Sequence, residues 1–242
     1  MDIHKPKPWH GWPELLKEIG TIVIGVLIAL GAEQAVEALH TARKTAEARE
    51  AVRGEIAADL GWMQSREAQQ RCVDARLDEL SAILTAAREG QPHPVVQWVG
   101  RVPNTPVSSR RWTAASQAGR VTLFDSGEQG AYATMYFVLD AFAAAEEQEQ
   151  QPWATLRTLE GARTLSPQMI WGLSEALMQA RLENFRAKRS TDRALADAKA
   201  LGVTPVRPPH KPMDPALPPT CVPIGADRAT ALRMIANPTG EP

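Results

Sequence analysis

The sequence predicts an all-α protein. An N-terminal transmembrane helix continues into a long helix of an elongated antiparallel helical bundle, and a proline-rich C-terminal strap follows. Three observations lead to this class. Residues 19–32 (IGTIVIGVLIALGA) are fourteen consecutive uncharged, mostly apolar positions in a chain that is otherwise rich in charge. Alanine dominates the apolar residues while tyrosine and phenylalanine are scarce, which favours helix over sheet. No segment alternates polar and apolar residues as a strand would.

The apolar segment is long enough to span a membrane once its flanks are included. Fourteen helical residues cover about 21 Å, whereas the hydrocarbon core is roughly 30 Å thick. Further apolar residues extend the segment to 15–39. Trp9 and Trp12 lie just before it, where aromatic side chains occupy a membrane interface, and Lys17 can extend its ammonium toward the headgroups. We therefore assign Trp9, Trp12 and Lys17 to the membrane interface and expect the lipid bilayer as a partner.

Two other interpretations of this segment remain open. A cleaved signal peptide needs a small-x-small site, which Ala29-Leu-Gly31 could supply, but Glu14 and Glu18 place acid beside the apolar core. A buried helix of a soluble bundle could have a similar composition. The uncleaved anchor is favoured, because helix-forming sequence continues past the potential cleavage point.

Basic residues near the segment indicate its orientation. Three precede residues 19–32 and two follow them within fifteen residues: Lys5, Lys7, Lys17, Arg43 and Lys44. The positive-inside rule then favours a cytoplasmic N-terminus and a periplasmic body. A wider window that includes Arg49 and Arg53 removes this bias.

The body is predicted to begin as a continuation of the same helix. From Glu33 to Glu89 there is no proline, and apolar residues recur at steps of three and four. One helix is therefore expected through this range, bent near Gly61 and ended by Gly90.

Shorter helices are expected after a loop at 92–107, with ends set by capping residues, glycine and proline. Their expected ranges are 109–118, 126–150, 152–159, 166–201 and 227–235. The second opens with Ser126-Gly-Glu-Gln129, the Ser-x-x-Gln pattern of a capping box, and should bury Met135, Val138, Leu139 and Phe142. Pro152 should end it, because proline inside a helix removes a backbone hydrogen bond.

The composition changes after Gly202. Eight prolines from Pro205 to Pro223 exclude regular helix and favour an extended, polyproline-like strap. Cys72 and Cys221 are the two cysteines of the chain. In an oxidising compartment they could form a disulfide that attaches the strap to the long helix, provided that their Cα atoms lie within about 7 Å. Two unrelated thiols are the alternative.

These features divide the chain into an N-terminal tail (1–14), the transmembrane helix (15–39), a helical bundle domain (40–201) and the strap (202–242). The 27 basic and 28 acidic residues give a net charge of −1. Nucleic-acid binding requires an excess of positive charge, so no nucleic-acid partner is expected.

Candidate ligand sites are few. Arg110, Arg111 and Trp112 follow two serines at a helix start and could bind an anion or another ligand, although a capped helix is the more ordinary interpretation. Aromatic residues on the predicted helices could line a pocket: Tyr132, Tyr136, Trp153 and Trp171. Glu37-Ala-Leu-His40 matches one Glu-x-x-His element of di-iron bundles, but a second is missing. Common catalytic and metal-binding motifs are absent from the sequence, so no catalytic residue, metal or cofactor is expected.

The string from Glu18 to Gln34, with the Glu/Arg/Ala-rich helix through Asp59, resembles a family of uncharacterised proteobacterial proteins. The specific likeness covers residues 15–60, and a looser one extends to the Cys-Val-Pro at 221–223. The resemblance implies one N-terminal membrane helix and a helical extracytoplasmic body. The family carries no assigned activity, so it implies no catalytic residues.

The sequence therefore favours a non-enzymatic envelope interaction or accessory protein in the bacterial inner membrane, acting as a homo-oligomer or with a membrane protein partner. A ligand-sensing bundle that regulates a membrane partner is the alternative, and an enzyme using a cleft beside Arg110 and Arg111 is a third. A buried pocket with converging polar groups would favour the last two. A packed core with an exposed apolar stripe on the long helix would favour the first.

Overall fold

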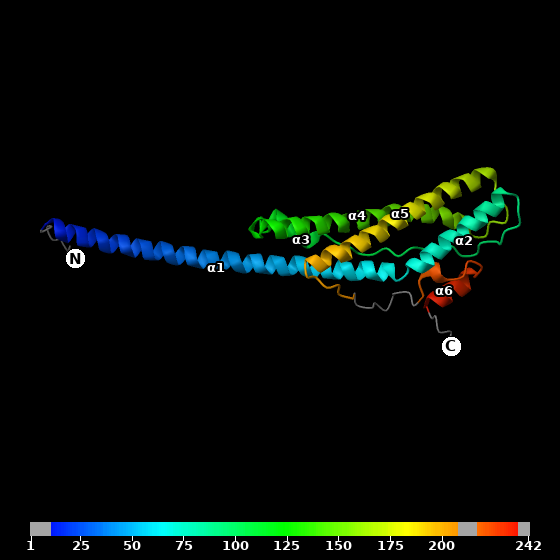
Figure 1. Ribbon diagram of the computed structural model, residues 1–242. Coiled ribbons are helices and arrows are strands. Elements are labelled where there is room, and N and C mark those ends of the chain that lie inside the picture. Colours follow the sequence, from blue (N-terminus) through cyan, green and yellow to red (C-terminus); the bar gives the residue numbers. More distant parts are fainter. Residues whose placement is uncertain (1–10, 208–216, 237–242) are drawn as a thin grey trace, which may run out of the picture. The chain divides into compact units, whose positions relative to one another are not determined.

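The computed structural model describes residues 11–207 and 217–236, and its regular elements over these ranges are helices (Figure 1). In chain order they are α1 (Trp12–Glu67), α2 (Gln70–Arg88), α3 (Arg110–Gln117), η1 (Val121–Leu123), α4 (Ser126–Leu156), η2 (Arg157–Leu159), α5 (Pro167–Ala200), η3 (Pro219–Cys221) and α6 (Arg228–Ala236). The all-α class with a long N-terminal helix is confirmed. Two compact units make up the chain, residues 1–49 and 50–242. The boundary between them falls inside the predicted bundle domain.

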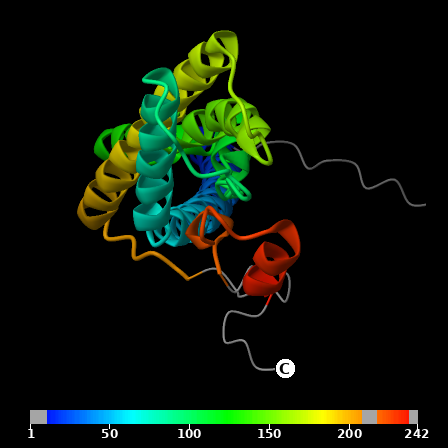
Figure 2. The ribbon, with the colours of Figure 1, turned by 90° about the vertical axis from the view of Figure 1, so that its right-hand side faces the viewer.

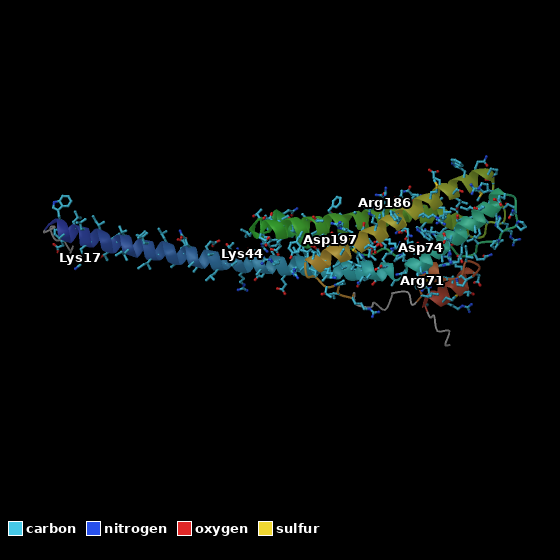
Figure 3. All side chains as sticks on the ribbon, in the orientation of Figure 1. Lys17, Lys44, Arg71, Asp74, Arg186 and Asp197 are labelled. Carbon is cyan, nitrogen blue, oxygen red and sulfur yellow. A yellow bond between two sulfur atoms is a disulfide. The ribbon has the colours of Figure 1, made fainter. Side chains whose placement is uncertain are left out.

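In the first unit, α1 carries the apolar segment. This helix is long and apolar enough to cross a membrane, and none of its most apolar 18-residue window is buried. A core helix of a soluble bundle would bury one face, so this segment is not packed as such a helix. Trp12 is 78% exposed, and Lys17 is exposed near the start of the helix (Figure 3). Trp9 lies outside the described residues.

The prediction of one helix through Glu89, bent near Gly61, is wrong. Two residues, 68–69, form a turn between α1 and α2, while Gly61 lies inside α1 and its carbonyl accepts the Ser65 hydroxyl. Neither turn residue is glycine or proline, so no helix-breaking residue marks this position. The turn allows α2 to change direction and bury its apolar stripe against α5 and the loop after α2. The buried residues of the stripe are Val73, Leu77, Leu80, Ile83 and Leu84.

In the second unit, α5 is the central helix of the packing. Both α4 and α2 pack against it (Figure 2). The face predicted for the helix after Ser126 is buried: Met135, Val138, Leu139 and Phe142. The helix predicted at 166–201 is also found, with Ser166 as the N-cap whose side chain accepts from the Met169 amide. Arg186 is exposed on α5 (Figure 3), whereas Asp74 on α2 accepts a hydrogen bond from the Asn184 side chain of α5 at 2.8 Å.

Two details of α4 differ from the prediction. Asp125, rather than Ser126, is its N-cap, and the Asp125 side chain accepts from the Glu128 amide. Pro152 does not end the helix, which continues to Leu156. Pro152 costs one backbone hydrogen bond, but the turn that follows it buries Trp153, whose indole also donates to Glu149 at 3.1 Å. This burial keeps the chain helical.

One buried cation connects three helices of the second unit. Arg66 on α1 is 2% exposed, and its Nη2 donates to both carboxylate oxygens of Glu149 on α4, at 3.2 and 3.1 Å. The same Nη2 donates to the Asn184 side-chain oxygen on α5 at 3.2 Å. Glu146, one turn before Glu149, lies 3.8 Å from Arg66 Nε. A buried charge must keep its partners, so this group fixes how the three helices align.

Two buried carboxyl groups make stability depend on pH. Burial raises the pKa of Asp59 and of Glu146 to about 7 each, from ordinary values of 3.8 and 4.5. The folded state therefore keeps protons that the unfolded chain has already lost. Their contribution to stability is complete below about pH 4 and decreases as the pH rises through about 7.

We predict that Asp59→Asn weakens this pH dependence. The wild-type free energy of unfolding should fall between pH 5 and pH 8 by on the order of 1–3 kcal/mol because of Asp59. In Asp59→Asn that part of the fall should disappear, since the amide imitates the protonated acid. Chemical denaturation of the full chain in detergent at several pH values measures it. Asp192→Asn, on the exposed face of α5, is the control and should retain the wild-type slope; parallel slopes for all three proteins would contradict the prediction.

Candidate functional site

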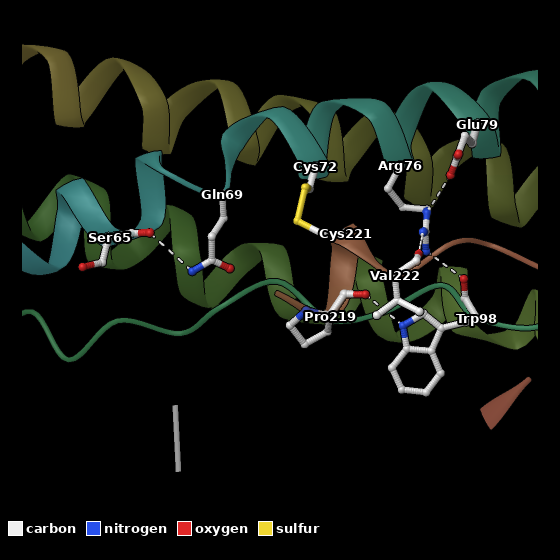
Figure 4. The surroundings of a disulfide bond; sticks show 9 residues. All are labelled: Ser65, Gln69, Cys72, Arg76, Glu79, Trp98, Pro219, Cys221 and Val222. Atoms are coloured by element: carbon white, nitrogen blue, oxygen red, sulfur yellow. Dashed lines mark hydrogen bonds and ion pairs between the residues drawn. A yellow bond between two sulfur atoms is a disulfide. The ribbon is translucent and has the colours of Figure 1, made fainter. Parts of the chain in front are cut away.

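The structure joins Cys72 on α2 to Cys221 at the end of η3 in a disulfide (Figure 4). Their Cα atoms are 4.9 Å apart, within the limit of about 7 Å that the sequence argument requires. The bond closes a loop of 149 residues and attaches residues 217–236 of the strap to the bundle. Residues 208–216 of the strap lie outside the described residues.

Arg76, one turn after Cys72 on α2, holds the same strap by hydrogen bonds (Figure 4). Its side chain is 2% exposed and donates to the carbonyls of Trp98 and Val99, at 2.7 and 2.6 Å, and to the carbonyl of Val222. Its Nε donates to Glu79 at 2.8 Å. Burial lowers the pKa of Arg76 below its ordinary value. A single guanidinium thus joins α2, the loop after it and the strap.

The loop and the strap also contact each other directly. The Trp98 indole donates to the Pro219 carbonyl at 2.8 Å, and the amides of Gln97 and Trp98 donate to the Ile224 carbonyl. Gly100 has a φ of +88°, and a Cβ there would lie 2.6 Å from the Pro219 carbonyl oxygen. Glycine is therefore required at this point for both conformation and space.

The candidate anion site at the start of α3 is occupied by the chain itself. The Glu55 carboxylate, on α1, accepts from the amides of Arg111 and Trp112, at 2.9 to 3.3 Å. It also accepts from the hydroxyls of Ser108, at 3.3 Å, and Tyr136, at 2.8 Å. The side chains of Arg110 and Arg111 point away into solvent and are exposed. An external anion would have to displace Glu55, so this turn is a capped helix that serves the fold.

The structure does not bring the four candidate pocket aromatics together. Tyr132, Tyr136 and Trp153 are buried core residues, whereas Trp171 is 77% exposed. Trp112 stacks on Tyr136 with ring centroids 5.1 Å apart and lies 6.2 Å from Tyr132. These rings pack against one another between α3 and α4, and the Tyr136 hydroxyl donates to Glu55 on α1.

A groove lies between α2 and α5, and no pattern in the sequence indicated it. It has a volume of about 800 Å³. Its lining is mostly apolar with a few charged groups, and includes Leu84, Thr85, Arg88, Trp171, Met178 and Arg181. Arg181 donates to Asp78 across the groove at 2.7 Å. Beyond this ion pair, a second hollow of about 430 Å³ continues between the same two helices.

Large apolar side chains continue along α5 past the groove. Trp171, Met178 and Phe185 are separated by seven residues each, and they are 77%, 69% and 59% exposed. Leu182 adds a fourth side chain to this row, at 43% exposed. We call these four residues the α5 stripe. The seven-residue spacing was visible in the sequence, but the opposite face of α5 is apolar too, and only the structure separates the buried face from the exposed one.

The comparisons with known proteins add no analogy: no family model, curated protein or solved structure matches this chain. Within the described ranges, no group of three or more His, Cys, Asp or Glu is arranged to hold a metal ion. The groove and the α5 stripe are therefore interpreted from their own geometry. They offer apolar contact with a few charges at the edge, an arrangement suited to binding.

We predict that Gly100→Ala loosens the contact between the loop after α2 and the strap, and does so more than Gly90→Ala. Alanine at positive φ costs about 1–2 kcal/mol, and at Gly100 the methyl group also collides with the Pro219 carbonyl. Hydrogen exchange at the Gln97 and Trp98 amides, which donate to Ile224, should accelerate at least tenfold.

Gly90→Ala is the matched control. Gly90 also has a positive φ, +69°, but no atom lies within 4 Å of the added Cβ. It should lower the overall stability similarly without selectively accelerating those two amides. Equal exchange in both variants would mean that the close approach to Pro219 is unimportant.

Proposed function

We propose that this protein is a single-pass membrane protein of the bacterial inner membrane, with its N-terminus in the cytoplasm and its helical body in the periplasm. It acts as a non-enzymatic interaction or accessory protein that binds another component of the envelope. The exposed apolar helix of the first unit is the observation that carries this proposal.

The anchor follows from the cost of exposing apolar surface to water. Large aliphatic side chains in the segment 19–32 are 47–66% exposed, and none of the most apolar 18-residue window of α1 is buried by the described residues. Each such side chain gains roughly 1.5–3 kcal/mol when it leaves water. A helix of this composition is therefore stable in a bilayer and unfavourable in solution. Trp12 and Lys17, at its start, have the chemistry of interfacial residues.

The periplasmic location of the body is supported by the disulfide. Structural disulfides form and persist in oxidising compartments, whereas the cytosol keeps thiols reduced. The Cys72–Cys221 pair lies in the second unit. A body in the periplasm agrees with the larger number of basic residues before the apolar segment.

Interaction is favoured over catalysis by the kind of surface that the body presents. Two of its buried charged groups are engaged within the core: Arg66 with Glu149, and Glu55 with the start of α3. The exposed apolar side chains are instead grouped on α5 beside the α2–α5 groove. An exposed apolar stripe on the long N-terminal helix was the feature that would favour an interaction protein; the stripe of the body lies on α5 instead, and its exposed apolar surface is what supports binding here.

A ligand-sensing domain is the second candidate. The α2–α5 groove, at about 800 Å³, has the volume of a small-molecule site, and the hydroxyl of Thr85 and the guanidinium of Arg88 line it. This candidate would use the same groove for a small amphiphilic ligand.

We predict that Val26→Arg with Leu27→Arg removes the protein from the membrane fraction or prevents its accumulation. Each arginine near the bilayer centre costs at least about 2.5 kcal/mol. Fractionation after alkaline carbonate extraction measures the effect. Phe137→Arg with Leu232→Arg, two exposed apolar positions of the second unit, is the matched control and should remain membrane-bound. Wild-type protein recovered in the soluble fraction would overturn the anchor.

We also predict that the whole population is oxidised in cells. When thiols are blocked before lysis, the wild-type protein should migrate faster on a non-reducing gel than on a reducing gel. Cys72→Ser and Cys221→Ser should each abolish the difference, since the 149-residue loop opens in both. A fully thiol-blocked wild-type protein would place the body in the cytoplasm.

A further inference from the structure

We propose that the α2–α5 groove and the α5 stripe together bind an amphipathic α-helix of a partner protein, and that an acidic residue of that helix pairs with Arg88. The inference rests on the proposed interaction function and names the surface and the chemistry of the partner.

The exposed apolar surface has the length and pattern of a helix-binding site. The α5 stripe extends from Trp171 to Phe185, fourteen residues or roughly 21 Å along the helix axis. Soluble surfaces seldom group large aromatic and methionine side chains in this way, and interfaces are enriched in them. A helix laid between α2 and α5 would cover the row with side chains at positions i, i+3 or i+4, and i+7.

The side chains that line the groove favour a helical partner segment over an extended one. The described residues contain helices and no strand, so no sheet edge is offered to an extended peptide. Such a peptide would bury amide and carbonyl groups without partners against apolar side chains. A helix satisfies its own backbone hydrogen bonds before it binds. It would complete a three-helix arrangement with α2 and α5.

The size of the stripe argues against a small molecule. Trp171 and Met178 line the groove, and Leu182 and Phe185 follow Arg181 of the ion pair along α5, with Phe185 lining the second hollow. A ligand that fills only the 800 Å³ hollow would leave this second pair exposed. A helix of about four turns would cover both parts.

The charges at the groove point to an acidic partner residue. Arg88 ends α2 and lines the groove, and none of the carboxylates in the described part of the chain forms an ion pair with it. Arg181 is already paired with Asp78, and Glu175 is the remaining charge in the lining. A carboxylate on the partner helix near Arg88 would neutralise that cation, whereas a lysine there would be repelled.

The test is site-specific crosslinking in intact cells with the full chain. A photoreactive phenylalanine analogue replaces Thr85, which is exposed in the lining of the groove. Mass spectrometry then identifies the crosslinked peptide. The proposal expects one protein segment with apolar residues at helical spacing and an acidic residue beside them.

Charge reversal then tests the pairing. Arg88→Glu should lower the adduct yield at least tenfold, and replacing the acidic residue of the captured segment by lysine should restore it. Met178→Glu should lower the yield at least tenfold, and Phe137→Glu is its matched control, because Phe137 is 73% exposed on α4 and should leave the yield unchanged. All four residues are exposed, and unchanged circular dichroism of each variant would show that the fold is retained.

Several outcomes would overturn the inference. They are an adduct to a second copy of this chain, an adduct to lipid or another small molecule, an adduct to a segment without helical apolar spacing, and no adduct at all. Membrane fractionation of the same cells separates this inference from the proposed function. A membrane-bound protein without the expected adduct refutes the helix-binding groove alone, whereas a soluble protein with it refutes the anchor alone.

Discussion

The guanidinium of Arg66 imposes a constraint on the helical body that the remaining packing must satisfy. Once it is enclosed, it needs carboxylate and amide partners, and these come from Glu149 on α4 and Asn184 on α5. Leaving any of these groups buried without its partner costs several kcal/mol. Sliding one helix past another would break the contacts, so the network selects one alignment. The apolar residues around it can then pack closely without having to specify that alignment themselves.

A second buried arginine performs a similar task for the strap. Arg76 contacts carbonyls in the loop after α2 and in the strap, and the Cys72–Cys221 bond lies one turn away. The disulfide limits how far the strap can move, while the hydrogen bonds and the close approach at Gly100 define where it lies. Covalent and non-covalent contacts therefore act on the same short segment.

In the second unit, charged groups that stabilise the fold are buried, whereas the large apolar side chains of the α5 stripe are exposed. The buried arginines Arg66 and Arg76 have partners inside the fold, and the first turn of α3 is neutralised by Glu55 rather than by a ligand. The α5 stripe has no such internal partner. Surface of this kind is costly to keep in water, and its concentration beside one groove is the property that supports binding. In the proposed function, stability and recognition therefore depend on different faces of α5.

Local patterns in the sequence determined much of the secondary structure. Apolar residues at steps of three and four identified the buried face of α4, and Ser166 and Gly202 marked the ends of α5, because periodicity and capping depend on neighbouring residues alone. The two cysteines and the composition of the strap likewise indicated a disulfide before any distance was known.

Only the tertiary structure decided the features that depend on residues distant in the sequence. The turn at 68–69 and the helix through Pro152 contradict local rules, because burial of α2 and of Trp153 outweighs them. Glu55 fills the anion site from 56 residues away in the chain, and the groove exists because α2 and α5 lie side by side. Sequence alone therefore determined most of the helices and the anchor-like first segment, but not the break between α1 and α2. Packing decided which face of α5 remained exposed, because burial is a property of neighbours that no local pattern records.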